Sequence, residues 1–157
     1  MDVDAELAAC KEELKAAMRL GLGAVLRLAG SLTERAFLAR DLLHRAVLLQ
    51  SAGECYLVVH RNIPTPHHEL ALLALEQAKS NFMSAAILYE ACGRAKAAAE
   101  VYSELLICLK RQILRMINHR NTEMVTALLS PVVRQCESRL EILEKGDGTE
   151  NFIYVNI

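Results

Sequence analysis

Histidine and glutamate stand side by side at His67, His68 and Glu69, where metal binding is the first chemistry to test. Neighbouring residues on a helix point about 100° apart, so adjacent histidines cannot chelate one ion as an i, i+4 pair can. The sequence contains neither H-E-x-x-H nor E-x-x-H. We therefore expect polar positions in a first helical turn here, and predict no metal site.

His44, in the stretch RDLLHRAVLLQSAG, raises phosphotransfer as a second chemistry, because phosphotransfer domains are helical bundles with one exposed histidine. Such domains leave open space after the histidine, whereas here Val47, Leu48 and Leu49 would close the site. The GLG at 21–23 lacks the Lys-Ser/Thr pair of a phosphate-binding loop, and no G-x-S-x-G motif occurs. We therefore assign no catalytic residue and no cofactor, and predict that the chain is not an enzyme.

The composition excludes several classes of protein. The formal net charge is −1 and the pI is near 6.5, whereas nucleic-acid binding needs a basic surface. The basic run KRQILRMINHR is interpreted as a solvated helix face. The acidic start MDVDAELAACKEELK does not resemble a signal peptide, and no uncharged apolar run approaches the length of a membrane span. Five scattered cysteines without C-x-x-C spacing indicate a reducing compartment, so a cytoplasmic location is predicted.

Helices are the predicted secondary structure throughout. Apolar residues make up 53% of the chain and aromatic ones only 4%, which suits packed helices better than a sandwich or barrel. Five helices are expected, over about residues 4–28, from Ser31 onward, and over about 65–92, 94–118 and 122–145. Joined by short loops, they would form an all-α antiparallel bundle.

Two helix boundaries have alternative interpretations. Ser31 and Glu34 form an S-x-x-E capping box, and the helix that they start either ends at Gly53 or continues toward His60. Pro131 either kinks the last helix or begins it, because proline lacks the N–H that a helix interior needs.

The chain divides into three predicted parts. Residues 1–62 form an N-terminal helical hairpin that packs on the bundle or extends it. Thr65, as N-cap with Pro66 at the first helical position, opens a three-helix bundle over 63–146. The tail, 147–157, opens with turn residues and closes with alternating apolar ones, so it is either disordered or docked.

The stretch GRAKAAAEVYSEL, residues 93–105, has the most informative spacing in the chain. Gly93 closes one helix and permits a tight antiparallel return. Ala98 lets the two helices approach closely, and Tyr102 packs beside it one turn later. The hairpin seam is predicted to consist of Ala86, Tyr89, Gly93, Ala98, Tyr102 and Leu105.

This spacing resembles the pattern G-x-x-x-x-A-x-x-x-Y of two families, the tetratricopeptide repeats and the MIT (microtubule-interacting and trafficking) domains. A tetratricopeptide helix would end earlier, with a proline, and its pattern would recur after 34 residues, which does not happen. The closing helix instead resembles that of an MIT domain, with Arg139, Glu141 and Leu143 at matching places. Ser138 and Leu140 depart from the family pattern. A tetratricopeptide-like hairpin stack and an unrelated bundle are the alternatives.

The MIT resemblance spans residues 65–145 and implies a binding module rather than an enzyme. MIT domains hold helical or extended tails of ESCRT-III subunits in grooves between helices, and attach enzymes to endosomal membranes. The resemblance places a groove between the last two helices, lined by Ile107, Leu114, Val133, Cys136, Glu137, Leu140, Glu141 and Leu143. Glu141 would pair with a basic residue of the partner, whereas Glu137 replaces the usual apolar residue. The alternatives are the groove between helices 65–92 and 122–145, or a groove filled internally.

These patterns predict a non-catalytic interaction or targeting module whose partner is a protein, either a peptide tail or a helix. Nucleic acid is not expected as a partner, and membranes are expected only through partners that recruit the chain to endosomes. The alternative is a helical oligomerisation domain or tetratricopeptide-like scaffold of a larger complex. The apolar content of 53% is compatible with burial between copies of the chain, and thus with a homo-oligomer. MIT-like modules are commonly appended to enzymes, so a longer parent protein is also expected.

Overall fold

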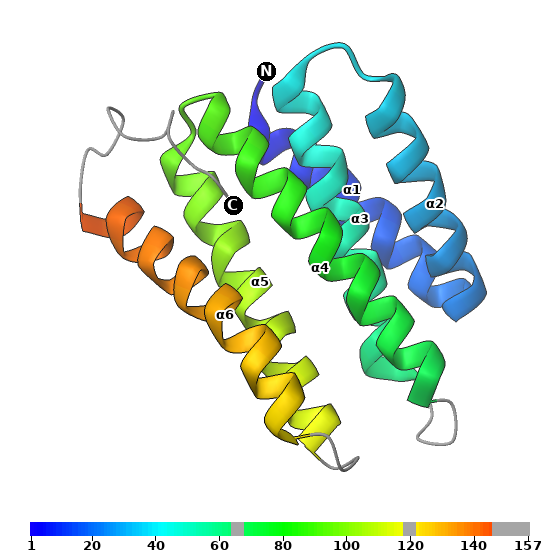
Figure 1. Ribbon diagram of the computed structural model, residues 1–157. Helices are drawn as coiled ribbons and strands as arrows, with labels where there is room; N and C mark the ends of the chain where they lie inside the picture. The colour runs from blue at the N-terminus through cyan, green and yellow to red at the C-terminus, as the bar shows by residue number, and fades with distance from the viewer. Residues whose placement is uncertain (64–67, 118–121, 146–157) are drawn as a thin grey trace.

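The computed structural model describes residues 1–63, 68–117 and 122–145 (Figure 1). Its six helices are α1 (Val3–Leu20), α2 (Leu22–Leu38), α3 (Leu42–Asn62), α4 (His68–Ala91), α5 (Ala95–Ile117) and α6 (Thr122–Lys145). No strand occurs in this part of the chain. The predicted all-α bundle is therefore confirmed, with six helices in place of the predicted five.

The helices alternate in direction and pack mainly against their neighbours in sequence. α2, α4 and α6 run the same way across the face turned toward the viewer, with α3 and α5 between and behind them (Figure 1). Close packing joins each helix to the next, and α1 also to α3. Within the described residues, α2 does not pack closely on α4, nor α4 on α6. Each of these two pairs is thus bridged by the helix between them.

The N-terminal segment differs from the prediction. α1 ends at Leu20, and Gly21, with φ of +113°, separates it from α2. Glycine adopts such a φ at little cost, because it has no Cβ. α2 then runs unbroken through Ser31, so the helix start predicted there is wrong, as is the single helix over 4–28. Residues 1–62 therefore contain three helices rather than a hairpin.

Burial explains why the capping box at Ser31 does not start a helix. Val25, Ala29, Leu32 and Ala36 recur at helical spacing on α2, and all four are buried. A continuous helix places all four on one side. A break at Ser31 would remove part of that buried face, so tertiary packing overrides the local capping preference.

The break between α2 and α3 is fixed by the side chains of Asp41, the N-cap of α3, and of Arg45 within α3. The Asp41 carboxylate accepts a hydrogen bond from Leu43 N at 3.1 Å and caps the start of α3. The Arg45 guanidinium donates to the carbonyl oxygens of Ala36, at 3.1 Å, and Ala39, at 2.7 Å. Ala36 O also accepts from Ala39 N at 3.2 Å, so Arg45 adds a second hydrogen bond to Ala36 O and binds the Ala39 carbonyl just beyond α2.

α3 continues through Gly53 to Asn62, so the longer of its two predicted ends is confirmed. Gly53 is buried against Phe82 of α4, and a Cβ at Gly53 would come within 2.7 Å of the ring. The missing side chain lets the two helices approach closely. α3 and α4 form the most extensively packed pair in the bundle.

The C-terminal half follows the prediction closely. Gly93 turns the chain between α4 and α5 with φ of +72°, the left-handed conformation that favours glycine after a helix. α6 begins and ends where predicted, and Pro131 lies inside it rather than at its start. The cap predicted at Thr65 and Pro66, and the tail 147–157, lie outside the described residues.

One hydrophobic core extends through the bundle. All six helices contribute to it, with buried residues such as Cys10, Val25, Val47, Tyr89, Leu105 and Leu143. α3 and α4 lie on either side of the boundary predicted between residues 62 and 63, and both contribute to the same core. The N-terminal helices therefore extend the core of the C-terminal ones.

The cysteines provide a test of this packing. All five are free thiols; Cys92 is half-buried beside the α4–α5 turn, and the other four are buried. Burial raises the pKa of Cys55 and Cys108 to about 12, and that of Cys136 to about 11. Because the thiolate is the reactive form, we expect Cys92 to react first with a soluble disulfide reagent, and all five thiols to react in urea. Rapid reaction of several thiols in the native chain would contradict this core.

Candidate functional site

The predicted hairpin seam lies between α4 and α5 and is inaccessible to a ligand. Its fully buried members are Ala86, Tyr89, Ala98, Tyr102 and Leu105. The Tyr89 hydroxyl donates to Gln50 Oε1 of α3 at 2.6 Å. The seam therefore holds α3, α4 and α5 together and has a structural role.

A buried polar network beside this seam ties α6 to the rest of the bundle. The Glu90 carboxylate of α4 accepts from the Tyr102 hydroxyl of α5 at 2.8 Å and from Arg139 Nε of α6 at 2.6 Å. The Glu90 side chain is 1% exposed and that of Arg139 is 12% exposed. Burial, followed by the hydrogen bond to Glu90, raises the pKa of Tyr102, so the hydroxyl remains a donor. Arg139, which the MIT resemblance placed at a motif position, is thus paired with Glu90 inside the bundle.

The sequence reasoning missed Glu90. The available signal was a lone carboxylate in the apolar stretch AAILYEACG. A charge in such a stretch is expected to be paired when the stretch is buried, because an unpaired buried charge is costly. Its partner, Arg139, lies 49 residues further along the chain, and sequence spacing does not connect the two.

The groove predicted between the last two helices is not an open groove in the structure. Cys136 and Leu143 of α6 are buried in the core, and Val133 and Leu140 are half-buried against it. Ile107 and Leu114 lie on an exposed face of α5, Leu114 with 64% of its side chain exposed. α5 and α6 pack closely, so core residues occupy the space between them.

The two predicted groove carboxylates are both on the surface of α6. Glu137 is exposed, so it takes no apolar groove position. Glu141 is exposed and pairs with Lys145 Nζ at 2.5 Å, one turn further along the helix. This hydrogen bond lowers the pKa of Glu141 and raises that of Lys145. The basic partner of Glu141 in the structure is therefore a residue of the same helix.

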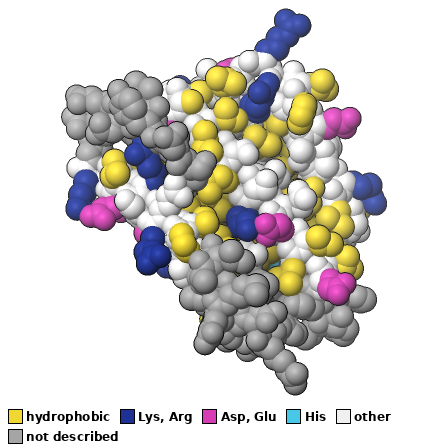
Figure 2. Space-filling model, in the orientation of Figure 1, with side chains coloured by type: hydrophobic (Ala, Val, Ile, Leu, Met, Phe, Trp, Pro, Cys, Tyr) yellow, Lys and Arg dark blue, Asp and Glu magenta, His cyan; other side chains and the backbone are white. Residues whose placement is uncertain are grey.

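A different groove lies between α2 and α4, with α3 as its floor, and we call it the α2–α4 groove. At one end is an apolar hollow of about 200 Å³ lined mainly by Leu26, Tyr56, Val59, Ile63, Leu70 and Leu73. Of these, Leu26, Leu70 and Leu73 are exposed. Hydrophobic side chains are spread over the face on which α2 and α4 lie (Figure 2). This hollow is suited to an apolar side chain of a ligand.

The other end of the α2–α4 groove is a hollow of about 330 Å³ whose lining surface is mostly apolar but includes several polar side chains, and we call it the polar hollow. Its polar lining residues are Thr33, Arg45, Asn81 and Ser84, and Phe37 and Leu49 are its large apolar ones. Arg45 is the charged residue of this lining, and it forms no ion pair with a described carboxylate. Asn81 is 8% exposed, and its Nδ2 has no hydrogen-bond partner in the described part of the chain. The Thr33 hydroxyl donates to Ala29 O at 2.8 Å and the Asn81 Nδ2 atom is enclosed, so Arg45 and Ser84 are the remaining donors of this lining.

Helical spacing shows which residues of α2 and α4 form the two walls of the groove. On α2, Leu26, Gly30, Thr33 and Phe37 recur at intervals of three and four residues and share one face. On α4, the wall consists of Leu70, Leu73, Gln77, Asn81 and Ser84, with the same kind of spacing. A Cβ at Gly30 would meet nothing within 4 Å, so the space above α2 is open there. Such paired walls are typical of sites that accept a helix.

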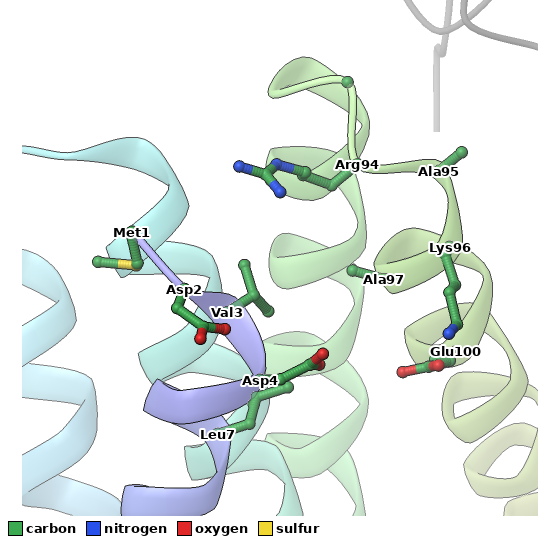
Figure 3. A pocket seen from close by; sticks show the side chains of 11 residues that line it. Met1, Asp2, Val3, Asp4, Leu7, Arg94, Ala95, Lys96, Ala97 and Glu100 are labelled. Atoms are coloured by element: carbon green, nitrogen blue, oxygen red, sulfur yellow. The ribbon is translucent and has the colours of Figure 1, made fainter.

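A further hollow of about 360 Å³ lies between the start of α1 and the α4–α5 turn (Figure 3). It is lined by carboxylates at Asp2, Asp4 and Glu100 and by cations at Arg94 and Lys96. Asp2 caps α1 by accepting from Ala5 N at 3.2 Å. The charges are mixed in sign, and the lining contains neither a histidine nor a cysteine.

The described residues contain no cluster of three or more His, Cys, Asp or Glu that could hold a metal ion. His44 is half-buried, and the ring of buried His60 has Nδ1 2.8 Å from Ala71 O. The side chains of His67 and His68 lie outside the described part. No described helix is long and apolar enough to cross a membrane.

Comparisons with known proteins do not extend this picture. No family model matches the chain, and neither the curated proteins nor the solved structures give a match.

Proposed function

We propose that this chain is a non-catalytic protein-interaction module that holds a partner helix or short peptide in the α2–α4 groove. The observation that carries the proposal is the apolar hollow, where three exposed leucines from two helices, Leu26, Leu70 and Leu73, line one cavity. Fully burying a leucine is worth about 1.5–3 kcal/mol, and these three are about half exposed, so covering all of them would contribute about 2–5 kcal/mol. This contribution would supply a large part of the free energy of a micromolar complex.

The partner class implied by the MIT resemblance is the tail of an ESCRT-III subunit, and we propose it as the first natural partner to test. Such tails place leucines in inter-helix grooves, which is the chemistry that the apolar hollow suits. Recruitment to endosomal membranes would then follow from the partner. The α2–α4 groove includes α2 and α3, which have no counterpart in a single MIT domain, so the binding mode would differ from that of the family.

Filling the groove is expected to abolish binding without unfolding the chain. The variant is Gly30→Trp, because the space above Gly30 is open and a large side chain there would cover the groove. The probes are 18-residue helical peptides selected on the full chain from a display library. We expect the variant to bind them at least about tenfold more weakly in a fluorescence-anisotropy titration. Its thermal unfolding midpoint is expected to stay near that of the natural chain.

Gly30→Ala is the matched control for this experiment. Alanine adds only a methyl group in open space, so peptide affinity should not change. A glycine inside a helix costs about 0.5–1 kcal/mol relative to alanine, so this variant should be slightly more stable. Peptides that bind natural chain and Gly30→Trp equally well would show that the α2–α4 groove is not the binding site.

Self-association through the end of α2 is a second candidate function. Phe37 and Leu38 have 85% and 79% of their surface exposed, and Leu42 is exposed beyond the break. A cluster of large apolar side chains on the surface often marks a contact between chains. Sedimentation equilibrium at micromolar concentration tests this candidate, and a monomer at all concentrations would eliminate it.

A further inference from the structure

We propose that the occupant of the α2–α4 groove is an amphipathic helix of a partner protein that carries a carboxylate about two turns from its apolar anchor. This inference rests on the proposed function and specifies the chemistry of the partner. It depends on the pairing of the polar hollow with the apolar one along a single groove.

The buried amide of Asn81 points to an acceptor in the occupant. Asn81 is nine-tenths buried and lines the polar hollow, yet its Nδ2 has no partner within the described chain. Leaving a buried donor unpaired is unfavourable, so such a group requires an explanation. The Nδ2 atom is itself enclosed, so the amide would turn toward the hollow to donate to an acceptor that a ligand places there.

Charge complementarity identifies that acceptor as a carboxylate. The Arg45 guanidinium donates Nε and Nη2 to the carbonyls at the end of α2, which hold it in place beside the hollow. The described lining contains no acidic residue to balance this charge. Arg45 and Asn81 together therefore offer a fixed cation and a neutral donor, the combination that favours a carboxylate over a neutral oxygen.

The apolar hollow favours a helical occupant over an extended peptide. Its lining is almost entirely apolar, and Gln77 and Tyr56 supply its polar side chains. An extended peptide would leave backbone N–H and C=O groups there without partners, at considerable cost. A helix satisfies its own backbone and presents only side chains to the walls. The spacing of three and four residues along both walls suits the packing of a third helix between them.

The distance between the two hollows sets the spacing in the partner. Leu73 of the apolar hollow and Asn81 of the polar hollow are eight residues apart on α4. At a rise of 1.5 Å per residue, the two sites are about 12 Å apart. A partner helix lying along the groove would therefore place its apolar anchor seven or eight residues from its carboxylate.

The experiment is a selection of helical peptides with the full chain as target. The library presents 18-residue helices on an Ala- and Gln-rich scaffold, with one face randomised, and binders that also bind Gly30→Trp are removed. We expect the remaining peptides to carry Asp or Glu seven or eight residues from Leu, Ile, Met or Phe. In the tightest of them, replacing the acidic residue with its amide should weaken binding about tenfold or more.

The variant Asn81→Leu tests whether the peptide carboxylate binds in the polar hollow. Leucine has the same branched shape and the same number of side-chain heavy atoms as asparagine, and it removes the unpaired amide next to an open hollow, so the variant should unfold at no lower temperature than the natural chain. Replacing the peptide carboxylate with its amide should cost much less affinity in this variant, because one donor is gone. Ser80→Ala, at an exposed position of α4 outside the lining of both hollows, is the control and should change affinity less than about twofold.

The outcomes separate this inference from the proposed function. The selected peptides could show no acidic enrichment, or their acidic residue could be replaced without effect. Either result would overturn the inference that the partner carries a carboxylate, and would leave the groove as the binding site. Enrichment of proline-containing, non-helical peptides would overturn the inference that the occupant is a helix. A library that gives no groove-dependent peptide would eliminate both the inference and the function on which it rests.

Discussion

Replacing Gly53 with leucine is expected to prevent the chain from folding. A Cβ at this position would lie 2.7 Å from Phe82 Cε1 and 2.8 Å from Phe82 Cδ1. Phe82 is fully buried, so its ring has no free space into which it can move. The further carbon atoms of leucine would have to separate α3 from α4, the most extensively packed helices in the bundle. The measurement is circular dichroism in a urea titration.

Gly53→Ala gives the quantitative form of this prediction. Overpacking a core by one methyl group costs about 1–3 kcal/mol, and alanine returns about 1 kcal/mol because it favours a helix. We expect a net loss of up to about 2 kcal/mol in the free energy of unfolding. Gly30→Ala makes the same change in a helix where the added methyl group meets nothing, so it should be stabilising. A gain in stability at both glycines would contradict the close contact at Gly53.

The contrast between these two glycines shows what the sequence can predict about this fold. Gly21, Gly30, Gly53 and Gly93 all interrupt helical patterns, and sequence alone treats them alike. Gly93 was placed correctly because its turn is local and is followed at once by a new helix. Gly53 lies inside α3, where its missing side chain makes room for Phe82 of α4. Gly30 also lies inside a helix, but a Cβ there would meet nothing, so close packing accounts for Gly53 alone. Spacing along the chain does not reveal this difference.

The N-terminal helix boundaries were missed for a related reason. The break between α2 and α3 contains neither glycine nor proline, and its local signal is the single cap at Asp41. The stronger capping signal, at Ser31, lies in a stretch that the core keeps helical. Local sequence signals therefore predicted the Gly93 turn correctly. At Ser31 the capping signal was overridden, because the buried face of α2 continues through it.

The candidate groove depends even more on contacts between distant segments. The residues predicted for it came from a resemblance within α4–α6, and two of them, Cys136 and Leu143, are core residues. The α2–α4 groove joins helices that are not consecutive, so no spacing along the chain brings Leu26 to Leu73. The sequence does contain the repeat of three and four residues on each wall, but it does not say that the walls face each other.

Removing either charge of the buried Glu90–Arg139 pair is expected to destabilise the chain by about 3 kcal/mol, because the remaining charge stays buried without its partner. The variants are Glu90→Gln and Arg139→Met, with the free energy of unfolding measured in urea at neutral pH. Their double variant should lose less than the sum of the two, by about 1.5–3 kcal/mol, since it leaves no uncompensated charge of the pair. This coupling is what distinguishes an ion pair from two independent packing defects.

Arg35→Met is the matched control, because Arg35 pairs with Glu13 at 3.2 Å on the surface, where both side chains are more than 40% exposed. Solvent screens such a pair, so the loss there should stay below about 1 kcal/mol. Glu90 and Arg139 connect α4 to α6, two helices that otherwise share little packing within the described residues. Their removal should therefore also increase hydrogen exchange in α6 more than in α3. Additive losses at Glu90 and Arg139, with unchanged exchange in α6, would show that this contact does not hold α6 in place.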